Sequence, residues 1–142
     1  MAQLSATGPV LKACAAAVNV SAVTGCLGGG VTVAVTNDVS QTQAAPYIHL
    51  AVVSETRSDA MQKAGKVVLV AAHLYSDFAG ERELVLMLSA VVSVLHYAPL
   101  SIDGHALVSL EYDDVQSANV EEAIGQKRRH WVATFRAEVR QS

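Results

Sequence analysis

The chain has 142 residues, which suits one domain with a single core, since domains most often contain about 100–150 residues. Hydrophobic residues make up 51% of the sequence but aromatic residues only 5%, so that core must be built from Ala, Val and Leu. The formal net charge is −3, which argues against a free-standing nucleic-acid binder, because such a protein needs a basic face to displace counterions.

Charged residues make up only 16% of the chain, against about 25% in an ordinary soluble domain. Two explanations fit: a surface hidden against other subunits, or a genome that favours Ala and Val. Cys14 and Cys26 have no CxxC spacing and predict buried or half-buried free thiols in a reducing cytoplasm. No apolar run reaches the roughly 18 residues of a membrane helix, and the first ten residues lack a signal-peptide pattern. We expect a soluble protein made in the cytoplasm, without a membrane partner.

The first predicted element is a short helix. Thr7 can serve as its N-cap, and Pro9 is tolerated in the first turn, where amide donors are unpaired anyway. The helical pattern fades at Asn19, and residues 25–30 form a Gly-rich break. One apolar stripe of this helix contains Val10, Leu11, Cys14 and Val18.

Three β-rich stretches follow the break. Residues 32–39 predict a short strand, and residues 47–54 a clear one. Residues 66–75 are apolar on both faces, which is typical of a central strand. Between the last two, residues 55–65 are polar and predict a projecting loop. The charged residues of that loop are Arg57, Asp59 and Lys63.

The strongest predicted helix comes next. Asp77 can cap it, and Glu81 and Glu83 suit the positive end of the helix dipole. Pro99 is expected to end it, because the residue before proline disfavours helical backbone. Its apolar stripe contains Leu84, Leu88, Val91, Val92 and Leu95, and Leu86 and Met87 widen it, which predicts burial along more than one face.

Two strands complete the chain. The turn at Asp103-Gly104 leads into a strand over residues 106–115, and residues 117–130 are polar and predict a second long loop. From Trp131 to Arg140 apolar residues alternate with others, which predicts a strand with one face on the core. The charged residues of the second loop include Glu121, Glu122, Lys127, Arg128 and Arg129.

The predicted order is helix, weak strand, strand, strand, helix, strand, strand. Strand pairs on either side of a long helix indicate a single α+β domain with two main helices packed on one face of a largely antiparallel mixed sheet.

The sequence contains few patterns that are typical of catalytic or metal sites. The five histidines lack the HxH and HExxH spacings of metal sites, and His49 and His73 fall in strands, where satisfied structural histidines are expected. His105 follows a turn and is expected to be exposed. Asp113 and Asp114 are neighbours in a strand and point to opposite faces unless the strand bulges. We expect no catalytic residue, no metal and no cofactor.

Several stretches, taken in order, resemble the tail-terminator (tail-completion) proteins of long, flexible-tailed phages and of phage-like gene transfer particles. After the Ala-rich helix and Gly-rich break comes a Pro-Tyr pair with an apolar strand, residues 45–50. The strand end at residues 73–76 precedes a helix start at residues 79–83. Residues 95–108, LHYAPLSIDGHALV, are the most specific piece, and residues 129–131 lead into the final alternating strand.

The resemblance covers nearly the whole chain, so residues 1–142 are expected to form one tail-terminator-like domain in the tail or neck of a virion assembled in a bacterial cytoplasm. It implies a hexameric ring that caps the head-proximal end of the tail tube, stops its growth and receives the head connector. The implied partners are further copies of the chain, the tail tube protein and the connector or stopper protein, with DNA only passing through the pore. Two alternatives remain: another head–tail neck protein, such as a stopper or joining ring, or a small-molecule-binding α+β domain.

The two long polar loops are the candidate assembly contacts, because each exceeds a simple turn and mixes both signs of charge. A solvated loop is the alternative for the basic run in the second one. The candidate contact residues are Arg57, Asp59, Lys63, Glu121, Glu122, Lys127, Arg128 and Arg129.

Overall fold

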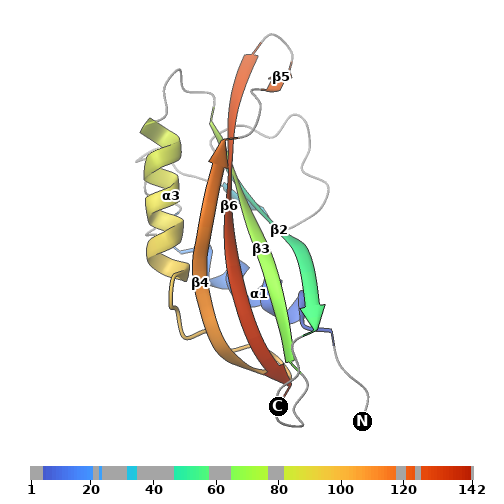
Figure 1. Cartoon of the computed structure of the whole chain (residues 1–142). Helices are drawn as coiled ribbons and strands as arrows, with labels where there is room; N and C mark the ends of the chain where they lie inside the picture. The colour runs from blue at the N-terminus through green and yellow to red at the C-terminus, as the bar shows by residue number, and fades with distance from the viewer. Residues whose placement is uncertain are drawn as a thin grey trace.

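The computed structural model describes residues 5–20, 23, 32–34, 47–57, 65–76, 82–117, 121–123 and 126–141. Two helices pack against a mixed, largely antiparallel sheet, which confirms the predicted α+β class (Figure 1). The helices are α1 (Thr7–Val18) and α3 (Arg82–Leu95), and the strands are β1 (Thr32–Ala34), β2 (Tyr47–Arg57), β3 (Gly65–Ser76), β4 (His105–Ser117), β5 (Glu121–Ala123) and β6 (Gln126–Gln141).

The strands lie in the order β1-β2-β3-β6-β4, with β5 paired to β6 beyond this path. β1 runs parallel to β2, and the remaining pairs are antiparallel. β3 is central, flanked by β2 and β6, as its apolar sequence predicts. Because successive side chains of a strand point to opposite faces, the sheet has one face toward the helices and one away from them.

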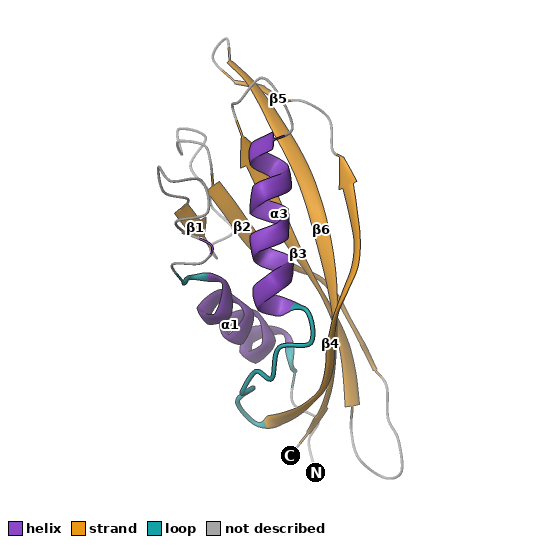
Figure 2. Cartoon of the chain, turned by 90° about the vertical axis from the view of Figure 1, so that its left-hand side faces the viewer, coloured by secondary structure: helices purple, strands orange, loops and turns teal. Residues whose placement is uncertain are grey.

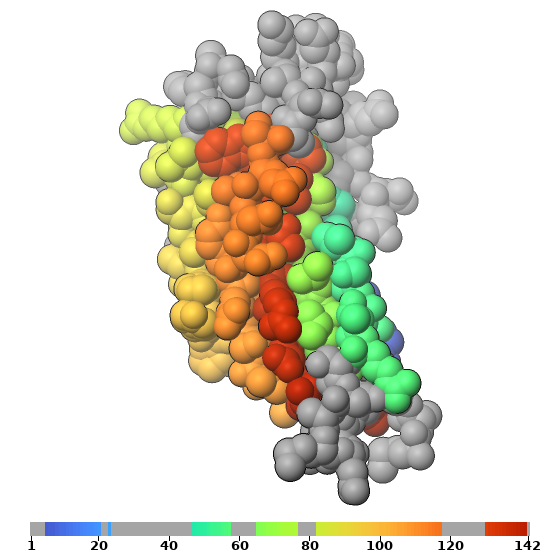
Figure 3. Space-filling view, viewed as in Figure 1, coloured from blue at the N-terminus to red at the C-terminus, as the bar shows by residue number. Residues whose placement is uncertain are grey.

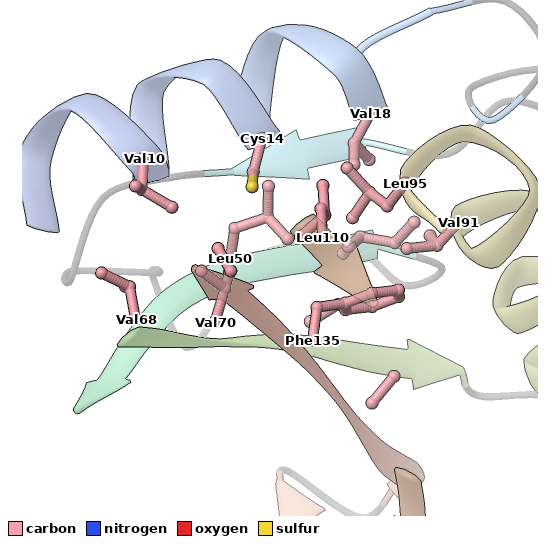
Figure 4. Packing of buried hydrophobic residues seen from close by; sticks show 14 of the residues in the cluster. Val10, Cys14, Val18, Leu50, Val68, Val70, Val91, Leu95, Leu110 and Phe135 are labelled. Atoms are coloured by element: carbon pink, nitrogen blue, oxygen red, sulfur yellow. The ribbon is translucent and has the colours of Figure 1, made fainter. Parts of the chain in front are cut away.

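The helices α1 and α3 pack on the same face of the sheet, here called the inner face (Figure 2). The alternation predicted for the last strand is confirmed, since Ala133, Phe135, Ala137 and Val139 are buried there. Phe135 lies under the meeting point of the two helices and β4 (Figure 4). Other buried members of the core include Val10, Cys14, Val18, Leu50, Val68, Val70, Leu74, Leu84, Met87, Val91, Leu95 and Leu110.

The predicted cap of α1 is wrong. Ala6, not Thr7, occupies the N-cap position, and it has no side chain that could accept a hydrogen bond. The Glu55 carboxylate of β2 takes this role: it accepts a 2.5 Å hydrogen bond from the Ala6 amide and is within 3.3 Å of the Ser5 hydroxyl. Because the capping residue is 49 positions away along the chain, the sequence around the start of α1 could not predict it.

The predicted end of α3 is also displaced. The helix stops at Leu95, before Pro99, because Tyr97 adopts a left-handed backbone conformation with φ 59°. Asp77 and Glu81 lie outside the described residues, whereas Glu83 is in the first turn and accepts a 2.6 Å hydrogen bond from the Ser76 hydroxyl. Burial along more than one face is wrong, since the buried residues share one side and Val85 and Leu86 are 47% and 40% exposed.

The predicted loop over residues 117–130 is largely strand. β4 continues to Ser117, and β5 and the start of β6 then form a hairpin. Likewise β2 extends to Arg57 and β3 begins at Gly65, so both ends of the predicted loop over residues 55–65 belong to strands. Main-chain hydrogen bonds sustain these pairings beyond the core, so no apolar alternation marks them.

Candidate assembly surfaces

The candidate contact residues of the second polar segment come together at one end of the sheet. The backbone register sets Glu121 opposite Arg128 and Glu122 opposite Lys127 in the β5–β6 hairpin. Arg129 follows on β6, opposite Ser76. The sequence places these acidic and basic residues in one segment, and the hairpin explains how strand pairing juxtaposes them.

Arg57 lies at the other end of the sheet. It is exposed at the end of β2 and pairs in register with Lys66, whose other neighbour is Val139 near the end of β6. Figure 1 shows the β5–β6 hairpin and the arrowhead of β2 at opposite ends of the molecule. Asp59 and Lys63 lie outside the described residues. The structure therefore divides the predicted contacts between two ends and does not gather them into one site.

A cluster of aromatic and histidine rings, missed by the sequence reasoning, occupies the face of the sheet that points away from the helices. Tyr75 of β3 stacks on Tyr47 of β2 at 4.5 Å and on His130 of β6 at 4.2 Å between ring centroids. His73 lies two residues before Tyr75, and its ring is 5.8 Å from that of His49. Cross-strand pairing of three strands creates this cluster.

His73 and His130 form its polar contact. Their Nδ1 and Nε2 atoms are 2.8 Å apart, a hydrogen bond in which one ring donates and the other accepts. Burial lowers the pKa of His130, because desolvation penalises the charged imidazolium. The expectation of satisfied histidines holds for His73 but is wrong for His49, whose buried Nε2 finds no hydrogen-bond partner among the described residues.

Two further expectations concern polar residues in β4 and the loop before it. His105 is buried, not exposed, and its Nδ1 lies 3.0 Å from the Asp103 carbonyl oxygen. The register of β4 shifts between Tyr112 and Asp114, so the strand does bulge at the paired aspartates. Asp113 and Asp114 are both exposed as a result.

The turn that follows α3 is hydrogen-bonded to the edge of β4 that does not pair with β6. The Tyr97 amide donates a 2.7 Å hydrogen bond to the Leu110 carbonyl, and the Tyr112 amide donates a 2.9 Å hydrogen bond to His96 Nδ1. These bonds hold Tyr97 in its left-handed conformation with its side chain 69% exposed. They also occupy main-chain groups that a free edge strand would offer to another strand.

Within the described ranges, no group of three or more His, Cys, Asp or Glu residues has an arrangement that could hold a metal ion. Over the same ranges, no helix is long and apolar enough to cross a membrane. The features that remain are surfaces: two sheet ends, an exposed helix face and a sheet face without a helix over it.

Comparison with known proteins agrees with this picture. A chain in the structure of the virion of a native gene transfer agent particle superposes with a TM-score of 0.74, at 21% sequence identity, over 97% of this chain and 99% of that one. That likeness shows the fold. No curated protein sequence matches the chain. The family model described as tail completion protein gp17 matches residues 9–140. The chain therefore belongs to the tail completion protein gp17 family and is a structural protein of the virion tail or neck.

Proposed function

We propose that residues 1–142 form a single tail-terminator domain, six copies of which make a ring on the head-proximal end of the tail tube. The ring stops tube growth and presents the surface on which the head connector docks. The match of the tail completion family over residues 9–140 is the observation that carries this proposal.

The two ends of the sheet support it. A terminator must bind the tube on one side of its ring and the connector on the other. The β5–β6 hairpin with Lys127, Arg128 and Arg129 lies at one end of the sheet, and Arg57 lies at the other. Both ends carry charged residues, which suit contacts that form only when the ring meets its partners.

DNA passes through the ring without being held there. The net charge of −3 and the absence of a basic face in the sequence favour a pore that repels the phosphate backbone weakly. The protein has no catalytic role and needs no cofactor, since its task is completed by docking.

Imaging the neck of assembled particles tests the ring. Six-fold density for this chain between tube and connector is the expected result. The variant Arg128→Glu/Arg129→Glu should keep the fold of the purified chain and reduce the yield of joined particles. A matched control, Lys12→Glu, reverses the charge of an exposed lysine that pairs with Asp103, at the end of the sheet opposite the hairpin, and should lower the yield less than the double variant. Normal yield from the double variant would count against the hairpin as a contact.

A further inference from the structure

The central strand β3 is apolar on both faces, but the described helices cover only one of them. Its inner-face residues Val68, Val70, Ala72 and Leu74 pack in the core under the helices. On the outer face, no described helix lies over β3, and the strands are open to view in Figure 3. The residues of β3 that point there include Val67 and Leu69, which are half-buried, and Ala71, which its neighbours already bury. Strands with two apolar faces are typical of sheets covered on both sides.

The neighbours of these side chains on β2 are uncharged as well. In register with Val67, Leu69 and Ala71 lie Thr56, Ser54 and Ala51. We call these six residues the outer strip. The β3 half of this strip departs from the usual alternation, in which the solvated face is polar, whereas Ser54 and Thr56 on β2 are polar but uncharged.

One acidic and two basic residues of β6 border the outer strip. On β6, Glu138 lies opposite Val67 and Arg136 opposite Leu69. The Glu138 carboxylate is 2.9 Å from the Arg140 guanidinium and 3.8 Å from that of Arg136. Glu138 therefore offsets one of the two guanidinium charges, and the other can stay in contact with solvent at the edge of a docked surface.

The exposed face of α3 is the second surface, and after the exposed Arg82 at the start of the helix it carries no charge. Between Glu83 and Asp103 the sequence contains no Asp, Glu, Lys or Arg. A surface helix of a monomer normally carries charged residues opposite its core stripe, and a helix without them is typically buried. The exposed residues of this face, here called the helix stripe, are Val85, Leu86, Ser89 and Ser93.

These two surfaces point in opposite directions. α3 rests on the inner face of the sheet and directs the helix stripe away from it, whereas the outer strip lies on the far side of the same sheet (Figure 2). A closed ring needs such an arrangement, because each subunit meets its two neighbours through different patches. If the helix stripes of two copies packed on each other, the contact would be two-fold symmetric and would give a dimer, not a ring.

We propose that the helix stripe of one copy packs on the outer strip of the next copy around the ring. This inference rests on the ring of the proposed function. The neighbour's α3 supplies a helix layer on the outer face of β3, where no described helix of the same copy lies, by the same helix-on-sheet packing that α1 and α3 make on the inner face. The residues of the outer strip and of the helix stripe carry no charge themselves, and Arg82 and Arg136 flank the contact. The small Ser89 and Ser93 side chains permit a close approach.

Strand addition at the edge of β4 is a less favourable contact between neighbouring copies than face packing. Strand addition there would need a continuous row of free main-chain groups. The Leu110 carbonyl and the Tyr112 amide are already bonded to the turn after α3, in the middle of that edge. Face packing is therefore favoured over strand addition at β4.

Cysteine cross-linking in assembled tails tests the interface. The pair Ser89→Cys and Leu69→Cys, in a Cys26→Ser background, should give a ladder of covalent oligomers with a short bis-maleimide. Cys14 is fully buried and does not interfere. Each single variant, and the control pair Lys12→Cys with Leu69→Cys, should stay monomeric on a denaturing gel. Dimers from Ser89→Cys alone would overturn the proposal, because they would place stripe against stripe.

A charge placed in the helix stripe gives an independent readout. Leu86→Glu should leave the urea unfolding midpoint of the purified chain unchanged and lower the yield of joined particles by about tenfold or more, because it buries an unpaired carboxylate. Wild-type yield would contradict the interface. Different results would contradict the two proposals. A neck that contains no ring of this chain would contradict the terminator assignment. An intact ring without the cross-link between the two introduced cysteines would contradict the interface alone.

Discussion

The Glu55 carboxylate on β2 accepts hydrogen bonds from the Ala6 amide and the Ser5 hydroxyl, and so caps α1 from a strand 49 residues away. The negative charge also lies at the positive end of the α1 dipole. One side chain therefore fixes where the first helix begins and how it is attached to the sheet.

Replacing Glu55 tests this attachment. Glu55→Ala should lower the free energy of unfolding by about 1 kcal/mol, the usual cost of a lost N-cap. Glu55→Gln should cost less, because an amide oxygen still accepts a hydrogen bond but the interaction with the dipole is lost. Urea unfolding followed by circular dichroism measures both. Thr56→Ala, an exposed neighbour on the same strand, is the control, and equal effects at the two positions would refute the cap.

Tyr97 carries a backbone penalty that a glycine would avoid. Its φ of 59° lies in the left-handed region, where a Cβ atom costs about 1–2 kcal/mol. Tyr97→Gly and Tyr97→Ala both remove the exposed ring, but only alanine keeps the Cβ. The glycine variant should be more stable than the alanine variant by about 1 kcal/mol in urea. An alanine variant as stable as the glycine variant would contradict the left-handed turn.

Stability should depend on pH through His130. Its pKa is lowered in the folded state by burial, so below about pH 6.5 the unfolded chain takes up a proton that the folded chain resists. The unfolded state then binds more protons, and the free energy of unfolding falls as the pH drops through this range. Protonating both rings would also break the His73–His130 hydrogen bond.

His130→Phe keeps a ring that can stack on Tyr75 but cannot titrate, so it should flatten the pH dependence of the unfolding midpoint between about pH 7 and 5. A second variant, His130→Gln, also removes the titrating ring and should flatten the slope equally, while the loss of the stack on Tyr75 lowers the midpoint at every pH. A slope that survives His130→Phe would assign the effect to other groups.

Cys14 should be chemically silent in the native protein. Burial raises the pKa of its thiol from 9.0 to about 12, and the thiolate is the reactive form. In a Cys26→Ser background, labelling by iodoacetamide at about pH 8 should be at least about a hundredfold slower in the folded chain than in urea. Rapid labelling of the native chain would show that α1 opens away from the sheet.

Several parts of the fold follow from side-chain periodicity. The alternation from Trp131 onward identifies the last strand and its core face, and the doubly apolar β3 sequence places that strand in the centre. Both predictions succeed because burial on a pleated strand imposes a two-residue period. The same rule fails for the β5–β6 hairpin, which is paired through the main chain and has no apolar alternation in its sequence.

Features made by distant residues could not be predicted. The Tyr47–Tyr75–His130 stack and the His73–His130 contact depend on the register between three strands. The cap of α1 depends on where β2 ends relative to Ala6. The charged residues of the candidate contacts were identifiable, but their division between two ends of the sheet required the strand order. The uncharged stretch after Glu83 was visible in the sequence, whereas its exposure on one side of α3 was not.

The most direct test of the terminator assignment is tail length, measured by electron microscopy of particles assembled with this gene deleted. A protein that caps the tube should leave overlong tubes without heads when it is missing. Tails of normal length that fail to join heads would contradict the capping role and move the protein to the neck, and unaltered infectious particles would contradict a role in assembly.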